Sequence, residues 1–202
     1  MAFMSRFSRN TSRSPVWRTH DDTVSHPILS VFELERLLYT GKTACNHVDE
    51  VCPGLYLGDQ DIAANRGELA RLNITHILNA SHNKWRGGAD YYEGTGICYL
   101  GIEAHDSPTF DMSPYFQPAA DFIHKALRRI LVHCAVGVSR SATLVLAYLM
   151  IYHHLTLVEA IKTVKDHRGI IPNRGFLRQL TTLDNSLRLK RRLAFQKFLP
   201  HL

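Results

Sequence analysis

The sequence predicts an α/β fold in which helices flank a mostly parallel central sheet. Short apolar runs with the composition of buried strands alternate with longer segments of helical periodicity. That alternation is typical of βαβ units, whose strands pair in parallel. The 202 residues also suit one domain with a substantial core, and they contain no visible internal repeat. We therefore expect a single layered α/β domain.

Strands are expected where apolar and β-branched residues form short runs. Helices are expected where apolar residues recur with helical spacing or where a capping pattern occurs, as in the capping box Thr156-Leu-Val-Glu159 and in Ser113 followed by Pro114. The predicted strands are residues 55–58, 74–80, 98–103 and 130–133, and the predicted helices are residues 31–39, 60–72, 113–127, 139–152, 156–168 and 175–187.

The stretch HCAVGVSRS joins the last predicted strand to a long apolar helix, and it places Cys134 and Arg140 six positions apart. A loop that opens a helix gathers free backbone N–H groups and the positive end of the helix dipole, which bind anions and favour a thiolate over a thiol. Gly137 lets the backbone curve around an anion. Arg140 offers a planar set of donors that matches two phosphate oxygens. The stretch predicts a phosphate cradle with a sulfur nucleophile.

Two ordinary alternatives explain this motif less well. Cys134 could be a buried cysteine at the end of a strand, which is the usual fate of a lone cysteine. It could also ligate zinc, but no CxxC or CxxH partner pair accompanies it. Neither alternative accounts for Gly137, Arg140 and the helix start that follows the cysteine.

The chain resembles the cysteine-dependent protein tyrosine phosphatases, whose signature is HC-x5-R-S, and in particular their small atypical dual-specificity branch. The resemblance runs from about His47 to Leu187, and it implies a protein-tyrosine-phosphatase-like three-layer fold with a central sheet of about five strands. The segments that carry it beyond the loop are LYLGDQDIA, THILNAS, YLGIEAHDSPTFDMS, SRSATLVLAYLM and IIPNRGFLRQL.

Cleavage of a phosphate ester through a thiolate needs a nucleophile, donors for the phosphate oxygens and a proton for the leaving oxygen. We expect Cys134 to form a phosphocysteine intermediate, and Arg140 to bind the oxygens together with backbone N–H groups. No metal or cofactor is expected, because the cradle supplies the positive field. The residues expected to surround the substrate phosphate are His133, Ala135, Val136, Gly137, Val138, Ser139 and Arg140.

Two carboxylates before the loop are candidates for the general acid. Asp111 precedes Ser113-Pro114, where a negative charge at a helix start is a sufficient reason for its presence. Asp106 directly follows a predicted strand and has no such structural reason, so we favour it, and the family resemblance places the acid at the same position. The resemblance also implies that Ser141 donates a hydrogen bond to the cysteine sulfur and eases its departure.

The side chains of the loop indicate the class of substrate. Ala135, Val136 and Val138 are uncharged, whereas the resemblance leads us to expect lysines here in lipid-directed relatives. The resemblance implies a shallow cleft that admits phosphoserine, phosphothreonine and phosphotyrosine in proteins, with mitogen-activated protein kinases as plausible substrates. A phosphate-binding scaffold without turnover and a lipid phosphatase are the alternatives.

The formal charge of +6 belongs to the two ends of the chain. The segments 1–20 and 186–202 contain nine of the 24 basic residues and none of the 18 acidic ones, so the body between them is net acidic. This distribution does not indicate a nucleic-acid-binding domain. We expect a disordered basic tail over 1–28, a phosphatase domain over 29–187 and a basic extension over 188–202.

The composition also bears on location. The four cysteines show no paired framework, which fits a reducing compartment, and no apolar run is long enough to span a bilayer. The Arg- and Ser-rich start has the composition of a mitochondrial transit peptide as well, but it lacks a sustained amphipathic face. We therefore expect the cytoplasm and nucleus, and the sequence gives no indication of oligomeric state.

Two positions depart from the family pattern. Cys52 stands where relatives usually have tryptophan, a change that would leave a cavity unless neighbours refill it. The segment Ala126-Leu-Arg-Arg-Ile130 lacks about four residues of the usual connector, although helix-to-strand loops typically take about 2–6 residues. We expect the preceding helix to unwind or the strand to start late.

Overall fold

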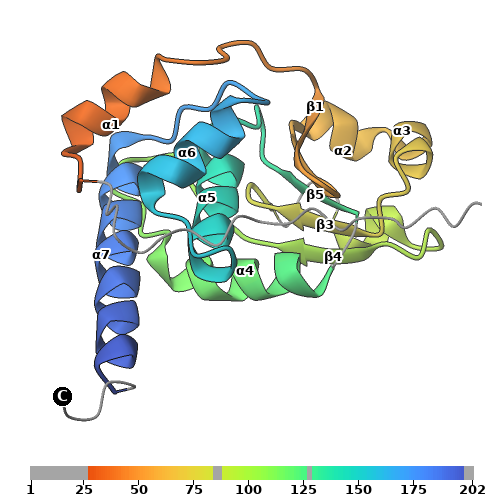
Figure 1. Cartoon of the computed structure of the whole chain (residues 1–202). Coiled ribbons are helices and arrows are strands. Elements are labelled where there is room, and N and C mark those ends of the chain that lie inside the picture. Colours follow the sequence, from red (N-terminus) through yellow and green to blue (C-terminus); the bar gives the residue numbers. More distant parts are fainter. Residues whose placement is uncertain (1–26, 84–87, 127–128, 198–202) are drawn as a thin grey trace, which may run out of the picture.

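The structure confirms the predicted α/β architecture (Figure 1). This computed structural model describes residues 27–83, 88–126 and 129–197. Five strands form one sheet in the order β1-β2-β5-β3-β4. Three neighbouring pairs are parallel, whereas β1 and β2 are antiparallel. The strands are β1 (Val48–Cys52), β2 (Leu55–Gly58), β3 (His76–Asn79), β4 (Cys98–Gly101) and β5 (Ile130–His133).

Apolar side chains on the two faces of the sheet build two separate cores. Leu57 and Val132 point into the main core, whereas their neighbours Tyr56 and Leu131 point into a smaller core on the other face. This alternation follows from the two-residue period of a strand. The main core lies beneath α4 (Phe116–Lys125) and α5 (Arg140–Tyr152), and the smaller one lies beneath α2 (Gln60–Ala64), α3 (Arg66–Arg71) and the short 3-10 helix η1 (Ala89–Tyr92).

Helix α5 lies at the centre of the helical layer and is apolar around most of its circumference, because it is surrounded by other elements. Three further helices pack around it or against its neighbours (Figure 1). The predicted capping box is present at the start of α6, where Thr156 and Glu159 bond each other's backbone N–H groups. These helices are α1 (Val31–Leu38), α6 (Leu157–Lys165) and α7 (Arg174–Lys197).

The single helix predicted over 60–72 was wrong, because the chain breaks it at Asn65. This residue has a non-helical ψ of 86°, ends α2 and begins α3. Its side-chain oxygen accepts a hydrogen bond from the backbone N–H of Glu68 at 3.1 Å. Asparagine competes well for backbone groups in this way, so a cap replaces a continuous helix.

Ser113 does not cap a helix as predicted. A 3-10 turn, η2 (Ser113–Tyr115), precedes α4, and the carboxylate of Asp111 accepts hydrogen bonds from the N–H and the hydroxyl of Ser113 at 3.0 and 2.6 Å. The hydroxyl is therefore a donor to Asp111. Because a carboxylate is the stronger acceptor, it takes the role that the serine oxygen was expected to play.

The connection from α4 to β5 is short, as the sequence indicated. Helix α4 ends at Lys125 and β5 begins at Ile130, while residues 127–128 lie outside the described residues. Arg129 donates from Nη1 to the hydroxyl of Tyr56 at 2.9 Å, and the N–H of Ile130 donates to the carbonyl of Gly54 at 3.0 Å. These contacts hold the start of β5 in register with β2.

Cys52 lies half-buried at the end of β1 and packs against the main core. Burial raises the pKa of its thiol to about 11, so it remains protonated at neutral pH. All four cysteines are free thiols. None of the helices in the described part of the chain combines the length and the apolar character needed to cross a bilayer. The expected basic tail falls almost entirely on residues 1–26, outside the described residues.

Candidate active site

The predicted loop leaves β5 and opens directly into α5. Cys134 lies at its floor with only 2% of its surface exposed. Its sulfur accepts two hydrogen bonds, one from the backbone N–H of Gly137 and one from the hydroxyl of Ser141, both at 3.2 Å. Donors directed at a sulfur stabilise negative charge on it, and the positive end of the α5 dipole adds to this effect. The loop thus directs two hydrogen-bond donors at the sulfur of Cys134.

Gly137 is required for the shape of this loop. Its φ is +78°, and a Cβ built at this position would lie 2.3 Å from the carbonyl oxygen of Gly58. Both the positive φ and the close approach of β2 exclude a larger residue. The glycine thus turns its N–H toward the sulfur of Cys134 while the loop stays packed on the sheet.

The side chain of Arg168 supports the loop, a role that the sequence did not indicate. Its side chain is fully buried. Nε donates to the carbonyl of Gly137 at 2.9 Å, and Nη2 donates to the carbonyl of Val136 at 3.3 Å. Nη1 donates to the carboxylate of Asp49 at 2.7 Å. In the sequence Arg168 follows a helix and precedes Gly169, a context that is equally typical of an exposed arginine.

Asp49 completes this buried ion pair. Burial by itself raises the pKa of its carboxyl, but the hydrogen bonds from Asn46 and Arg168 outweigh that effect and hold the pKa below its ordinary value. The side-chain amide of Asn46 donates at 2.6 Å and its backbone N–H at 3.1 Å. Asp49 is therefore ionised at neutral pH, and its charge balances the guanidinium beneath the loop.

Arg140 is the first residue of α5 and is half-buried at the edge of the loop. Its Nη1 donates to the carbonyl of Ala104 at 3.0 Å. Its Nε is buried and has no hydrogen-bond partner among the residues that the structure describes. An unpaired donor at a helix start is suited to an anion, which agrees with the predicted role of this residue.

Of the two predicted acid candidates, the structure brings Asp106 to the loop. One oxygen, Oδ1, accepts hydrogen bonds from the hydroxyl of Ser139 at 2.8 Å and from the side-chain amide of Asn173 at 2.9 Å. The backbone N–H of Asn173 also donates to the Ser139 hydroxyl at 3.2 Å. Asp111 instead binds Ser113 at the start of η2. Only Asp106 is therefore linked to the loop of Cys134 by these contacts.

The segment that carries Asp106 is fastened to α7. Gln179 accepts from the N–H of Met112 and donates to the carbonyl of Phe110, both at 2.8 Å. A Cβ at Gly175 would lie 2.0 Å from the carbonyl oxygen of Pro108, so this glycine allows a close approach. Gln179 and Gly175 both belong to the segment IIPNRGFLRQL. The structure shows that they hold the loop of Asp106.

The rim of the loop is apolar. Val136 is 62% exposed within the loop, and Ile171 is 56% exposed beside it. The N–H of Ile171 donates to the carbonyl of Val138 at 2.8 Å, which joins the two segments. The other predicted loop residues, Ala135 and Val138, are partly buried. An uncharged rim of this kind does not provide cations for a highly phosphorylated headgroup.

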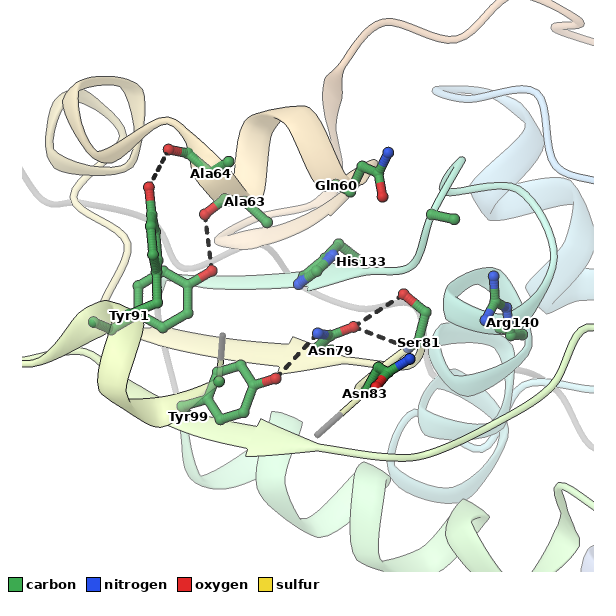
Figure 2. Close-up of a pocket in the computed structure, with 13 residues that line it drawn as sticks. Gln60, Ala63, Ala64, Asn79, Ser81, Asn83, Tyr91, Tyr99, His133 and Arg140 are labelled. Atoms are coloured by element: carbon green, nitrogen blue, oxygen red, sulfur yellow. Dashed lines mark hydrogen bonds between the residues drawn. The ribbon is translucent and has the colours of Figure 1, made fainter. Parts of the chain in front are cut away.

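His133 lines a cavity next to the loop, and Cys134 is not among the residues that line it (Figure 2). Its Nδ1 lies 3.4 Å from the carbonyl oxygen of Cys134. Burial lowers the pKa of the imidazole to about 4, so it is neutral at pH 7. We expected His133 to surround the substrate phosphate, and the structure places its free ring edge in this adjoining space instead.

The comparisons with known proteins agree with the geometry of the loop. The family described as dual specificity phosphatase, catalytic domain, matches residues 55–186. The chain is 75% identical over 197 residues to dual specificity protein phosphatase 26 of Pongo abelii and of Homo sapiens, with 93% of each chain covered. The crystal structure of human DUSP28 matches with a TM-score of 0.64 and 29% identity, over 73% of this chain and 99% of that one.

The fold and the loop together place the chain in the protein-tyrosine-phosphatase-like class. The chain belongs to the dual specificity phosphatase family, and it is a protein phosphatase.

Proposed function

We propose that this protein hydrolyses phosphotyrosine, phosphoserine and phosphothreonine in proteins through a phosphocysteine intermediate on Cys134. The carrying observation is the arrangement at the sulfur, which accepts hydrogen bonds from Gly137 and Ser141 at the N-terminal end of α5. Thiolate nucleophiles in proteins are activated by such surroundings.

The first step transfers the phosphoryl group to the protein. The thiolate of Cys134 attacks phosphorus, the bond between phosphorus and the substrate oxygen breaks, and Asp106 gives its proton to that oxygen. Arg140 and the N–H groups of the loop bind the phosphate oxygens while charge shifts between them. The hydrogen bonds from Ser139 and Asn173 both fall on Oδ1 of Asp106, so we assign the transferred proton to Oδ2.

The second step returns the thiolate. Water attacks the phosphocysteine, Asp106 accepts a proton from that water, and the phosphorus–sulfur bond breaks to give inorganic phosphate. The hydroxyl of Ser141, 3.2 Å from the sulfur, stabilises the charge that develops on the departing thiolate. Arg140 and the N–H groups of the loop bind the phosphate oxygens in both steps.

The proposed substrates are phosphoproteins, and mitogen-activated protein kinases are the ones that the resemblance suggests. The uncharged rim formed by Val136 and Ile171 supports proteins over phosphoinositides. The four free thiols are consistent with a reducing compartment, so we propose the cytoplasm and nucleus as the location.

Turnover of p-nitrophenyl phosphate, with Cys134→Ser as the control, tests this function. Wild type should turn over and form a phosphocysteine detectable by mass spectrometry after acid quench, whereas Cys134→Ser should do neither. A phosphorylated kinase should then lose phosphate from both threonine and tyrosine. Tight binding of phosphopeptides by folded wild type without turnover would reject the enzyme mechanism and favour a scaffold.

A further inference from the structure

A cavity of about 520 Å³ opens beside the loop of Cys134 and has no part in the proposed reaction. Ala135 and Arg140 line it, so it begins where the phosphate is expected to bind. From there it extends between α2 and η1, with His133 in its wall (Figure 2). Cys134 and Asp106 are not among its lining residues. The cavity is a neighbour of the reaction centre and not the centre itself.

The wall opposite the loop is aromatic and already held in place. The hydroxyl of Tyr92 donates to the carbonyl of Ala63 at 2.8 Å, and the hydroxyl of Tyr91 donates to the carbonyl of Ala64 (Figure 2). The side-chain amide of Asn79 donates to the hydroxyl of Tyr99 at 3.0 Å. These bonds fix the wall and satisfy its polar groups. The cavity is therefore formed before any ligand arrives.

His133 is the exception among these polar groups. Its Nε2 is buried and has no hydrogen-bond partner among the described residues, although the side chain is only 4% exposed. Its Nδ1 faces the carbonyl oxygen of Cys134, which can only accept, so the ring hydrogen is on Nδ1. The imidazole is neutral because burial lowers its pKa to about 4. Nε2 therefore carries the lone pair of a ring that lines the cavity (Figure 2).

A buried acceptor without a partner favours a ligand that donates a hydrogen bond to it, because leaving the acceptor unpaired costs free energy. A second phosphate group does not donate such a hydrogen bond, since its ionised oxygens are acceptors. A cationic side chain would lie close to the guanidinium of Arg140, and the described lining residues include no carboxylate to offset that repulsion. A neutral ring with an O–H donor fits both the lone pair and the tyrosine wall.

We propose that this cavity is a substrate subsite for an unphosphorylated tyrosine side chain that lies close to the phosphorylated residue in the substrate. The tyrosine ring packs against Tyr91, Tyr92 and Tyr99, and its hydroxyl donates to Nε2 of His133. This subsite deepens the proposed function and rests on it. It makes the enzyme select substrates by a residue that the reaction leaves unchanged.

Peptides that each contain one phosphotyrosine and one variable position test the subsite. Tyrosine and phenylalanine are compared at each of three positions on either side of the phosphotyrosine. A neutral hydrogen bond contributes modestly, so kcat/KM should be about three- to tenfold higher for tyrosine at one position and equal elsewhere. In ¹⁵N-histidine spectra of Cys134→Ser, the tyrosine peptide should shift the Nε2 resonance of His133, and the phenylalanine peptide should not.

A matched pair of variants tests the cavity itself. Ala64 is exposed and lines the cavity at the end of α2, whereas Ala70 is exposed on α3 and does not line it. Ala64→Trp should remove the preference for tyrosine and leave turnover of p-nitrophenyl phosphate within twofold. Ala70→Trp should change neither quantity.

The outcomes separate the subsite from the proposed function. Normal turnover of p-nitrophenyl phosphate with no tyrosine preference at any position overturns the subsite alone. A preference that survives in Ala64→Trp also overturns it, because the tyrosine then binds elsewhere. If wild type turns over neither the aryl phosphate nor any peptide, the proposed function is overturned, and the subsite falls with it.

Discussion

Similar side chains in this protein differ in function because their immediate partners differ. Asp106 and Asp111 are five positions apart, yet one carboxylate is bonded to the loop of Cys134 and the other to a helix start. Ser139 and Ser141 are likewise near neighbours, and one contacts a carboxylate whereas the other contacts the sulfur. The roles follow from these contacts and not from the residue type.

The first prediction concerns the proton donor. Asp106→Asn should lower kcat for phosphoserine peptides by about 10²–10⁴-fold, because a serine alkoxide is a poor leaving group without a proton. The loss should be much smaller for p-nitrophenyl phosphate, whose leaving group is stable as an anion. Steady-state kinetics on both substrates measure this difference. Asp111→Asn is the control, and a comparable loss in that variant would contradict the assignment of Asp106.

The second prediction concerns the hydroxyl that contacts the sulfur. Ser141→Ala removes a hydrogen bond to a charged atom, which contributes about 1.5–3 kcal/mol. Hydrolysis of the phosphocysteine should therefore slow roughly ten- to hundredfold. Rapid-quench measurements with p-nitrophenyl phosphate should show a burst of p-nitrophenol followed by a slow steady state. If the steady state slows without a burst, Ser141 acts in the first step instead.

Among the elements, the loop between β5 and α5 depends most on support from elsewhere in the chain. Residues 134–138 lie in neither a strand nor a helix, so their carbonyls need donors from other parts of the chain. Arg168, which follows α6, donates to the carbonyls of Gly137 and Val136, and Asp49 on β1 balances the charge of the arginine. Two elements far apart in the sequence thus hold one loop.

The third prediction follows from this support. Arg168→Met should lower the free energy of unfolding by about 3–5 kcal/mol, because it leaves Asp49 buried and unpaired. Urea denaturation followed by circular dichroism measures the change. Arg174→Ala, which breaks an exposed ion pair with Glu35, should leave the urea midpoint nearly unchanged. Equal losses of stability in the two variants would contradict the larger contribution that we assign to the buried ion pair.

For the molecule as a whole, the mostly parallel sheet places the site at one end of its strands. The β5 strand lies between β2 and β3, so the loop that follows β5 meets the loops that follow its neighbours. The short connection before β5 does not disturb this arrangement. Gly54 and Tyr56 fix the start of the strand through Ile130 and Arg129.

The fourth prediction tests that conclusion. Inserting four Gly, Pro and Ser residues after Ala126 should change kcat/KM for p-nitrophenyl phosphate by less than about threefold, because the strand register is set by contacts beyond the insertion. The cost of a longer loop is also small, since each doubling of its length costs about 0.6 kcal/mol. Activity and thermal-unfolding measurements on both chains check this. A large gain of activity would show that the short connection strains the site.

Much of the site could be predicted because its central residues are close in the sequence. Cys134, Gly137 and Arg140 occupy one loop, and their spacing alone indicates an anion site. Asp106 was favoured over Asp111 by its position after a strand, and the contacts agree. The break at Asn65 was missed because the competition between a side chain and the helix backbone is decided by small energies.

The local sequence therefore determined four of the five strands in the described part of the chain, the capping box and the loop, because these depend on near neighbours and on short-range backbone geometry. The tertiary structure decided which distant residues meet them. Asp106 reaches Ser139 across 33 positions, and Arg168 reaches Asp49 across 119. The direction of the His133 ring was decided in the same way. Such contacts depend on how whole elements pack, and no local pattern in the sequence records them.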